Sequence, residues 1–253
     1  MKEGSIGSLL NKIWRSLEKE SDEINLELMV SHWAPIEEVR ILSGDEKHKV
    51  RRIWERASSL SKVPTGYREF FRSLDYVRPP EGYEKIDETF STRTRLFLGS
   101  GFSGWETPLV TLLKPFSVPW VPGSSLKGAM RSVAEERGID SSALFGDKER
   151  KGNIIVVGGF IVPTEEEVLG VDVMTPHYKP YYEGKDWAKY PHEYLDPVPI
   201  KFLVVRENVP FRFIVMTLRG NIDEMKDILK ETLVSRGLGG KRSAGYGLFK
   251  GPV

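Results

Sequence analysis

The first third of the chain carries apolar residues at helical spacing. One run extends from Ile6 to Leu17 and a second from Val50 to Leu60, and in both the apolar positions recur every three or four residues. A third run, Tyr67 to Leu74, follows a break at Pro64. We therefore predict that residues 1–82 form a helical segment that packs on the main domain.

Beyond Gly82 the pattern predicts strands as well as helices. Apolar and polar residues alternate over residues 90–98, which is typical of a strand. The other strands are predicted at residues 153–162, 200–206, 211–218 and 246–250. Residues 163–199 lack clear periodicity and are predicted to be an insertion.

Two helices are predicted between these strands. The first begins at Ser124 as its N-cap and ends before Gly138, while the second begins at Asn221, with Glu224 in the capping-box position, and ends before Gly237. The resulting order is strand, helix, strand, strand, helix, strand. This order predicts an α+β domain of ferredoxin-like or RRM-like type over residues 83–253.

The composition is that of a packed globular protein, with 40% hydrophobic and 29% charged residues. Lys and Arg total 37 against 36 Asp and Glu, a balance that argues against strong unaided binding to nucleic acid but permits a local basic patch. The absence of cysteine excludes disulfides, thiol nucleophiles and thiolate metal sites. No stretch has the apolar length of a signal peptide or a membrane span, so we expect a cytoplasmic protein.

A first glycine motif, Val121 to Arg131, stands where the chain is predicted to enter a helix. The backbone N–H groups of a first helical turn have no partner within the helix, and the helix dipole favours an anion there. Lys127 and Arg131 are four residues apart and can share one face. A capped helix with two solvated cations explains this motif equally well.

A second glycine motif, Gly237 to Gly247, contains five glycines in eleven residues. Such a run can adopt positive φ angles and approach a ligand closely, and Lys241 and Arg242 lie within it. Tyr246 could stack on a base. The loop leaves a helix to enter a strand and does not fit G-x-x-x-x-G-K-[ST], so a P-loop and a Rossmann fingerprint are both excluded. We interpret it as a binding loop rather than a simple connection.

Together the two motifs resemble those of the RAMP superfamily of CRISPR-associated proteins. The segments Asp172 to Tyr182 and Asp196 to Leu203, with the ending Gly240 to Gly247, are most similar to the sixth-subunit family of type III-B (Cmr) effector complexes. The resemblance implies a non-catalytic RNA-binding subunit for antiviral defence, which caps the backbone filament at the 3′ region of the guide RNA. The implied partners are guide RNA, target RNA, the backbone RAMP subunit, the first RAMP subunit and the small helical subunit.

The resemblance also implies which residues contact RNA. They are the helix start and the glycine loop: Gly123, Ser124, Ser125, Lys127, Arg131, Gly239, Gly240, Lys241, Arg242, Ser243 and Tyr246. It further suggests that the 163–199 insertion is a thumb that wedges between bases. The thumb candidates are His177, Tyr178, Tyr181 and Tyr182, of which the three tyrosines would form the apolar wedge.

A metal site and RNA cleavage are two alternative kinds of chemistry for this chain. The spacing of His177 and His192 with nearby carboxylates matches no compact ligand motif, so we expect no metal and no cofactor. The alternative function is a metal-independent RAMP endoribonuclease that processes CRISPR transcripts, and such enzymes commonly place a His near the glycine loop as general acid or base. Neither glycine motif contains a His, and we assign no catalytic residue.

Overall fold

The computed structural model describes residues 63–99, 103–104, 107–108, 111–113, 116, 118–175, 181, 184, 190 and 199–252. The helical elements are α5 (Thr65–Ser73), η3 (Leu74–Tyr76), α6 (Gly123–Glu136), α7 (Ser141–Phe145), α9 (Ile222–Glu231), the π-helical turn η4 (Thr232–Arg236) and η5 (Arg242–Ala244). The strands are β1 (Tyr83–Thr92), β2 (Ser103–Gly104), β3 (Thr107–Pro108), β4 (Leu112–Leu113), β5 (Val118–Pro122), β6 (Ile154–Ile161), β7 (Leu169–Met174), β8 (Ile200–Val205), β9 (Pro210–Leu218) and β10 (Phe249–Pro252). Within these ranges no helix is long and apolar enough to cross a membrane.

The main sheet confirms the predicted α+β fold. Its strand order is β10-β1-β9-β6-β5-β4, with every neighbouring pair antiparallel. Without β2–β5, α7 and the β7–β8 hairpin, the chain runs β1, α6, β6, β9, α9, β10. In this reduced order α6 lies between β1 and β6, which have β9 between them in the sheet, and α9 lies between β9 and β10, which have β1 between them. This is the split βαβ arrangement of the ferredoxin-like fold.

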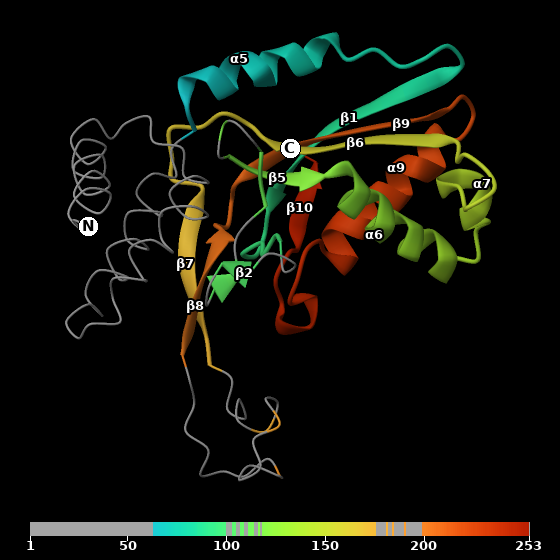
Figure 1. Cartoon of the computed structure of the whole chain (residues 1–253). Coiled ribbons are helices and arrows are strands. Elements are labelled where there is room, and N and C mark those ends of the chain that lie inside the picture. Colours follow the sequence, from blue (N-terminus) through green and yellow to red (C-terminus); the bar gives the residue numbers. More distant parts are fainter. Residues whose placement is uncertain are drawn as a thin grey trace, which may run out of the picture.

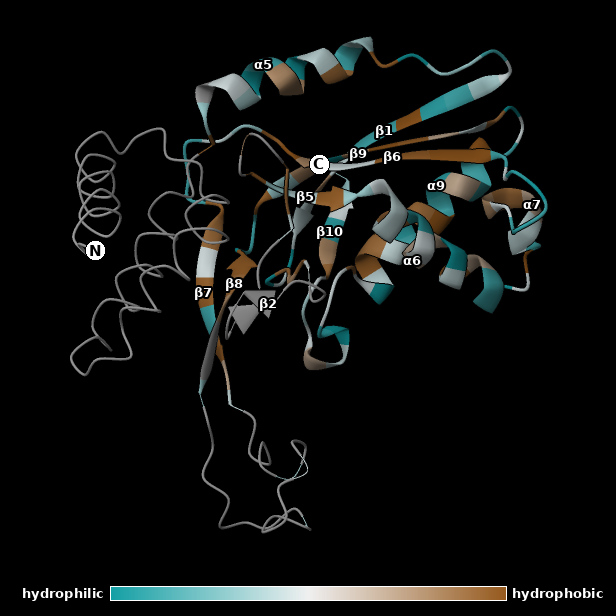
Figure 2. Cartoon of the chain, viewed as in Figure 1, coloured by the Kyte–Doolittle hydropathy of each residue, from teal (hydrophilic) through white to brown (hydrophobic). Residues whose placement is uncertain are grey.

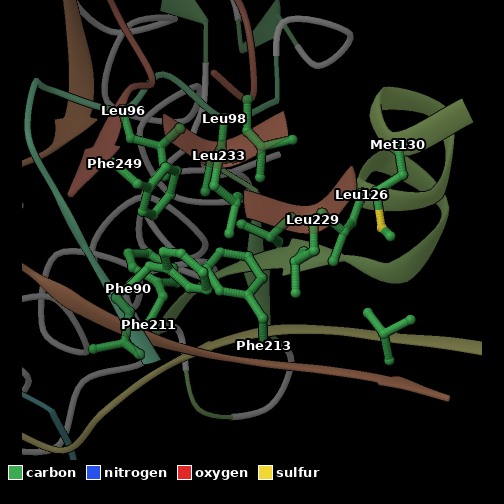
Figure 3. Packing of buried hydrophobic residues seen from close by; sticks show 14 of the residues in the cluster. Phe90, Leu96, Leu98, Leu126, Met130, Phe211, Phe213, Leu229, Leu233 and Phe249 are labelled. Atoms are coloured by element: carbon green, nitrogen blue, oxygen red, sulfur yellow. The ribbon is translucent and has the colours of Figure 1, made fainter. Parts of the chain in front are cut away.

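The core lies between the sheet and the two long helices α6 and α9. Phe90, Phe211 and Phe213 point from the central strands toward Leu126 and Leu229 on the helices (Figure 3). All five side chains are fully buried. β6 is hydrophobic along most of its length, whereas α6 and α9 each carry both kinds of residue, as expected for helices buried on one side (Figure 2).

The opposite face of the sheet is covered by α5 (Figure 1). The hydroxyl of Tyr67 donates to the carbonyl oxygen of Ile161 at 2.7 Å, and Phe70 packs edge-on against Phe160. Arg212 on β9 forms ion pairs beneath this helix with Asp87 and Asp75. Both faces of the sheet are therefore covered.

The β7–β8 hairpin extends away from the sheet (Figure 1). β7 lies within residues 163–199, for which the sequence predicted no strand, and it pairs in antiparallel fashion with β8 over six residues each. Between the first predicted strand and the first predicted helix, where the sequence analysis predicted no strand, the structure contains four short strands, β2 to β5. Two of them, β4 and β5, extend the sheet beyond β6.

Several predicted boundaries were wrong. The first strand ends at Thr92 rather than 98, because residues 96 and 97 leave the sheet and form isolated bridges to β8 and to the glycine loop. α6 begins at Gly123 with Pro122, not Ser124, in the N-cap position. Asn221 is the N-cap of α9, but its side chain makes no capping hydrogen bond, so the predicted capping box is absent. The last strand begins at Phe249, which leaves Tyr246 in the preceding loop.

Candidate functional site

The structure brings parts of the two glycine motifs together around one pocket of about 450 Å³. The first motif contributes the start of α6, and the second contributes the beginning of the loop that follows α9 and η4. The pocket is lined by Leu98, Gly99, Thr111, Val121, Pro122, Ser125, Gly128, Ala129, Ser132, Gly237, Leu238, Gly239, Gly240 and Arg242.

Small residues on one face of α6 form one wall of the pocket. Ser125, Gly128, Ala129 and Ser132 follow the spacing of one helical face and leave room beside the helix. No side chain caps the N-terminus of α6. Its first-turn N–H groups therefore supply hydrogen-bond donors and a positive dipole end beside Pro122 and Ser125, which suits an anionic ligand.

Close backbone packing explains several glycines of the two motifs. A Cβ atom at Gly123 would lie 2.2 Å from the carbonyl oxygen of Val156, and one at Gly239 would lie 2.2 Å from that of Phe97. Gly247 has a φ of 82°, and a Cβ there would lie 1.9 Å from the carbonyl oxygen of Leu238. These glycines shape the loop and the helix start around which the pocket forms.

The two adjacent cations of the loop lie in different surroundings. Arg242 is exposed and lines the pocket. Lys241 adopts a left-handed backbone conformation, with a φ of 58°. Its ammonium lies over the rings of Phe97 and Phe202, at 5.8 and 5.4 Å from their centroids, so cation–π attraction holds it away from the pocket wall.

Tyr246 is attached to the β7–β8 hairpin. Its hydroxyl donates to Oδ2 of Asp172 at 2.6 Å, and Nη1 of Arg95 lies 2.8 Å from the same oxygen. Burial and the hydrogen bond to Asp172 raise the pKa of Tyr246 to about 12. Burial alone would raise the pKa of Asp172, but the hydrogen bonds from Tyr246 and Arg95 outweigh it and lower that pKa.

The remaining candidates, three from the first motif and Ser243 from the second, lie outside the pocket lining. Ser124 is exposed and Lys127 is half-buried on another face of α6. Arg131 donates from Nη1 to the carbonyl oxygen of Gly146 at 3.0 Å and from Nε to Glu135 at 2.9 Å, which ties α6 to the turn after α7. Ser243 is exposed in η5 and is not among the lining residues.

The thumb candidates can be placed only in part. Tyr181 is exposed, with 40% of its surface accessible. His177, Tyr178 and Tyr182 lie outside the described residues. Over the ranges that the structure describes, no group of three His, Asp or Glu side chains is arranged to hold a metal ion.

Sequence reasoning missed several lining residues. The sequence could have indicated three of them, because helical spacing from Ser125 places Gly128, Ala129 and Ser132 on the same face of the helix. It could not have indicated Leu98 and Thr111, since they reach the pocket only through tertiary folding.

Comparisons with known proteins agree with the fold. The profile of the RAMP superfamily matches residues 89–250, which include both glycine motifs. The chain is 24% identical over 233 residues to the CRISPR system CMR subunit Cmr6 of Saccharolobus solfataricus, with 85% of this chain and 79% of that protein covered. It is also 24% identical over 250 residues to the CRISPR system Cmr subunit Cmr6 of Pyrococcus furiosus, with 72% of each covered. A chain of a cryo-EM structure of the Type III-B Cmr-beta bound to cognate target RNA has a similar fold, with a TM-score of 0.67 and 24% identity over 96% of both chains.

Proposed function

Since the chain belongs to the RAMP superfamily, we propose that it is a Cmr6-like, RNA-binding subunit of a type III-B Cmr effector complex. Two curated relatives that bear that subunit's name support the assignment. The observation that carries the RNA-binding part of the proposal is the pocket in which the start of α6 and the glycine loop meet.

The pocket suits the phosphodiester backbone of an RNA strand. The lining residues carry three kinds of donor: the backbone N–H of Ser125 in the uncapped first turn of α6, the hydroxyls of Ser125 and Ser132, and the guanidinium of Arg242. Phosphate oxygens accept hydrogen bonds from all three. Such contacts hold a strand without reading its sequence, as a subunit that binds guides of many sequences requires.

The partners of the subunit follow from the same assignment. We propose that it caps the backbone filament at the 3′ region of the guide RNA and helps to hold guide and target RNA. There it would contact the backbone RAMP subunit, the first RAMP subunit and the small helical subunit. The similarity of its fold to a chain from a Cmr-beta structure bound to target RNA supports membership of such a complex.

The chemistry of the pocket favours binding over RNA cleavage. General acid–base cleavage needs a group that transfers protons near neutral pH, most often a His. The lining residues that the structure describes include no His, Lys, Tyr, Asp or Glu. All four histidines, His32, His48, His177 and His192, lie outside the described residues, so incubation of the purified chain with repeat RNA remains the direct check. Metal-independent cleavage that depends on one of them would contradict a binding-only role.

Two single substitutions in the loop test the RNA-binding proposal. Arg242→Ala removes the cation that lines the pocket and should weaken binding of a labelled polyuridylate oligonucleotide by about tenfold. It should also reduce the slope of log K against log salt by about 0.7, the value expected for one lost phosphate contact on a single strand. Fluorescence anisotropy over a series of salt concentrations measures both quantities.

Lys241→Ala is the control for the salt slope, because it removes the same charge from the neighbouring position. Its ammonium faces Phe97 and Phe202 and not the pocket, so its loss should loosen the loop and lower affinity but leave the salt slope at the wild-type value. If Arg242→Ala leaves affinity and slope unchanged, the pocket is not an RNA site.

A further inference from the structure

Residues 93–98 lie between the glycine loop and the β7–β8 hairpin. On one side, the N–H of Gly247 donates to the carbonyl oxygen of Arg95 at 2.9 Å, and the N–H of Gly240 donates to that of Phe97 at 2.8 Å. On the other side, Leu96 and Val205 of β8 exchange two backbone hydrogen bonds of 2.9 and 2.8 Å. The loop and the hairpin are thus bonded to opposite edges of one short segment.

Side chains connect the loop to the hairpin directly at two points. At the first, the ammonium of Lys241 lies over Phe202 of β8 and contacts the sulfur of Met174 of β7. At the second, the hydroxyl of Tyr246 donates to Asp172 of β7, and its ring lies 6.1 Å from that of Phe202. Both points of attachment therefore lead to the same hairpin.

These attachments bracket the residue that faces the pocket. Arg242 opens the short turn η5, which lies between Lys241 and Gly245, and Tyr246 follows directly. A segment with five glycines loses more backbone entropy on ordering than an ordinary loop, so contacts outside the loop must hold it in one conformation. The attachments at Lys241 and Tyr246 supply those contacts.

We infer that Asp172 is a positioning residue of the pocket: through its bonds to Tyr246 and Arg95, the β7–β8 hairpin holds the glycine loop in the conformation that presents Arg242. The lowered pKa of Asp172 keeps its carboxylate charged at neutral pH, which strengthens both bonds. The inference rests on the proposed function for the identity of the ligand, RNA, but not for the geometry. Because coupling between sites is reciprocal, RNA bound at the pocket should in turn stabilise the base of the hairpin.

The test compares Asp172→Ala with Glu167→Gln in the full-length chain. Glu167 pairs with Arg206 at the base of the same hairpin and, within the described part of the chain, makes no polar contact with the loop, so it is the matched control. In Asp172→Ala, the amides of Gly240 and Gly247 should exchange with deuterium about tenfold faster, the effect of losing one charge-assisted hydrogen bond. Affinity for polyuridylate should fall by about the same factor, and Glu167→Gln should change neither quantity.

A double-mutant cycle separates positioning from a general loss of stability. Tyr246→Phe removes the donor, so adding Asp172→Ala in that background should raise the exchange of the Gly247 amide by clearly less than it does alone. Equal effects in both backgrounds, or unchanged exchange in Asp172→Ala, would overturn the inference.

The RNA measurements distinguish this inference from the proposed function. If Arg242→Ala weakens RNA binding while Asp172→Ala speeds loop exchange without weakening it, the pocket binds RNA and the positioning role is wrong. If neither substitution weakens RNA binding although loop exchange rises, the RNA-binding proposal fails and the attachment of the loop to the hairpin stands.

Discussion

Replacing Arg212 with alanine tests how α5 is held on the outer face of the sheet. Nε and Nη2 of Arg212 bind the two carboxylate oxygens of Asp87 at 2.6 and 2.7 Å, and Nη1 binds Asp75 at 2.7 Å. The guanidinium also lies 5.6 Å from the ring centroid of Phe71 on α5. One side chain thus connects two central strands to the helix that covers them.

The size of the effect follows from burial and from the partners that remain. Hydrogen bonds to charged groups contribute about 1.5–3 kcal/mol each, and the side chains of Arg212 and Asp87 are only 15% and 21% exposed. Lys85 lies 2.8 Å from Asp87 and remains in the variant, so it should limit the penalty of an unpaired carboxylate. We therefore expect a loss of about 2 kcal/mol in the free energy of unfolding. In a domain of this size, that corresponds to a drop in Tm of about 4–8 °C.

The stability difference between wild type and Arg212→Ala should also depend on pH. Burial alone would raise the pKa of Asp87, but the hydrogen bonds from Arg212 and Lys85 outweigh it and lower that pKa. A carboxylate whose pKa is lower in the folded state than in the unfolded state stabilises the folded state. This contribution is fully present above the unfolded-state pKa, about 3.9 for Asp, and is lost as the pH falls through the folded-state pKa. The difference in stability between wild type and Arg212→Ala should therefore shrink between pH 5 and about pH 2.

Thermal unfolding monitored by circular dichroism measures both effects, with Arg68→Ala as the control. Arg68 is also an arginine that forms an ion pair, but its partner Glu165 is 87% exposed, so its loss should cost less than about 0.5 kcal/mol. Equal Tm values for the two variants, or a difference between wild type and Arg212→Ala that does not change in acid, would refute the reasoning.

Two further predictions concern the core and the start of α6. The hydroxyl of buried Thr217 has no hydrogen-bond partner among the described residues, so Thr217→Val should raise the free energy of unfolding by about 1 kcal/mol in denaturant titrations; a loss of stability would mean that the hydroxyl is satisfied. Gly123→Ala should destabilise the domain by about 3 kcal/mol, because its Cβ would collide with the Val156 carbonyl. In the same helix, the Cβ of Gly128→Ala would meet nothing within 4 Å, so this variant should stabilise the domain by about 0.5–1 kcal/mol. Similar denaturation midpoints for both alanine variants would contradict the geometry of the helix start.

The parts of the fold that the sequence predicted correctly are those encoded by local patterns. β6 and β9 show strand-like apolar runs, and the helix ends near Gly138 and Gly237 appear as glycines with φ angles of 72° and 75°. β5 was missed because it contains Pro119 and Pro122, residues that lower the strand propensity of a segment and are tolerated here near the margin of the sheet. β7 was missed because it belongs to a two-stranded hairpin in which several side chains stay partly exposed, which weakens the apolar pattern.

The sequence predicted the two motifs of the site, but not how their side chains are arranged in space. Glycine content indicated a backbone that something approaches closely, and at Gly239 and Gly247 that neighbour is the protein's own backbone. Lys241 and Arg242 are equivalent in sequence terms, yet the left-handed conformation of Lys241 directs its side chain toward Phe97 and Phe202. Only the tertiary structure reveals that difference, because the aromatic rings come from distant segments.

The covering of the outer sheet face decides where RNA can lie on this domain. RRM domains read single-stranded RNA with aromatic side chains on an open sheet face, whereas here Trp120 and Phe160 stack on each other in the cluster beneath α5. Exposing that face means withdrawing buried aromatic residues such as Tyr67, at about 1.5–3 kcal/mol for each large side chain. The pocket beside α6 requires no such displacement. Arg242 is the one cationic side chain among the described lining residues, and the chain carries a net charge of +1. We therefore expect the proposed RNA contact to need backbone donors and cations from neighbouring subunits as well.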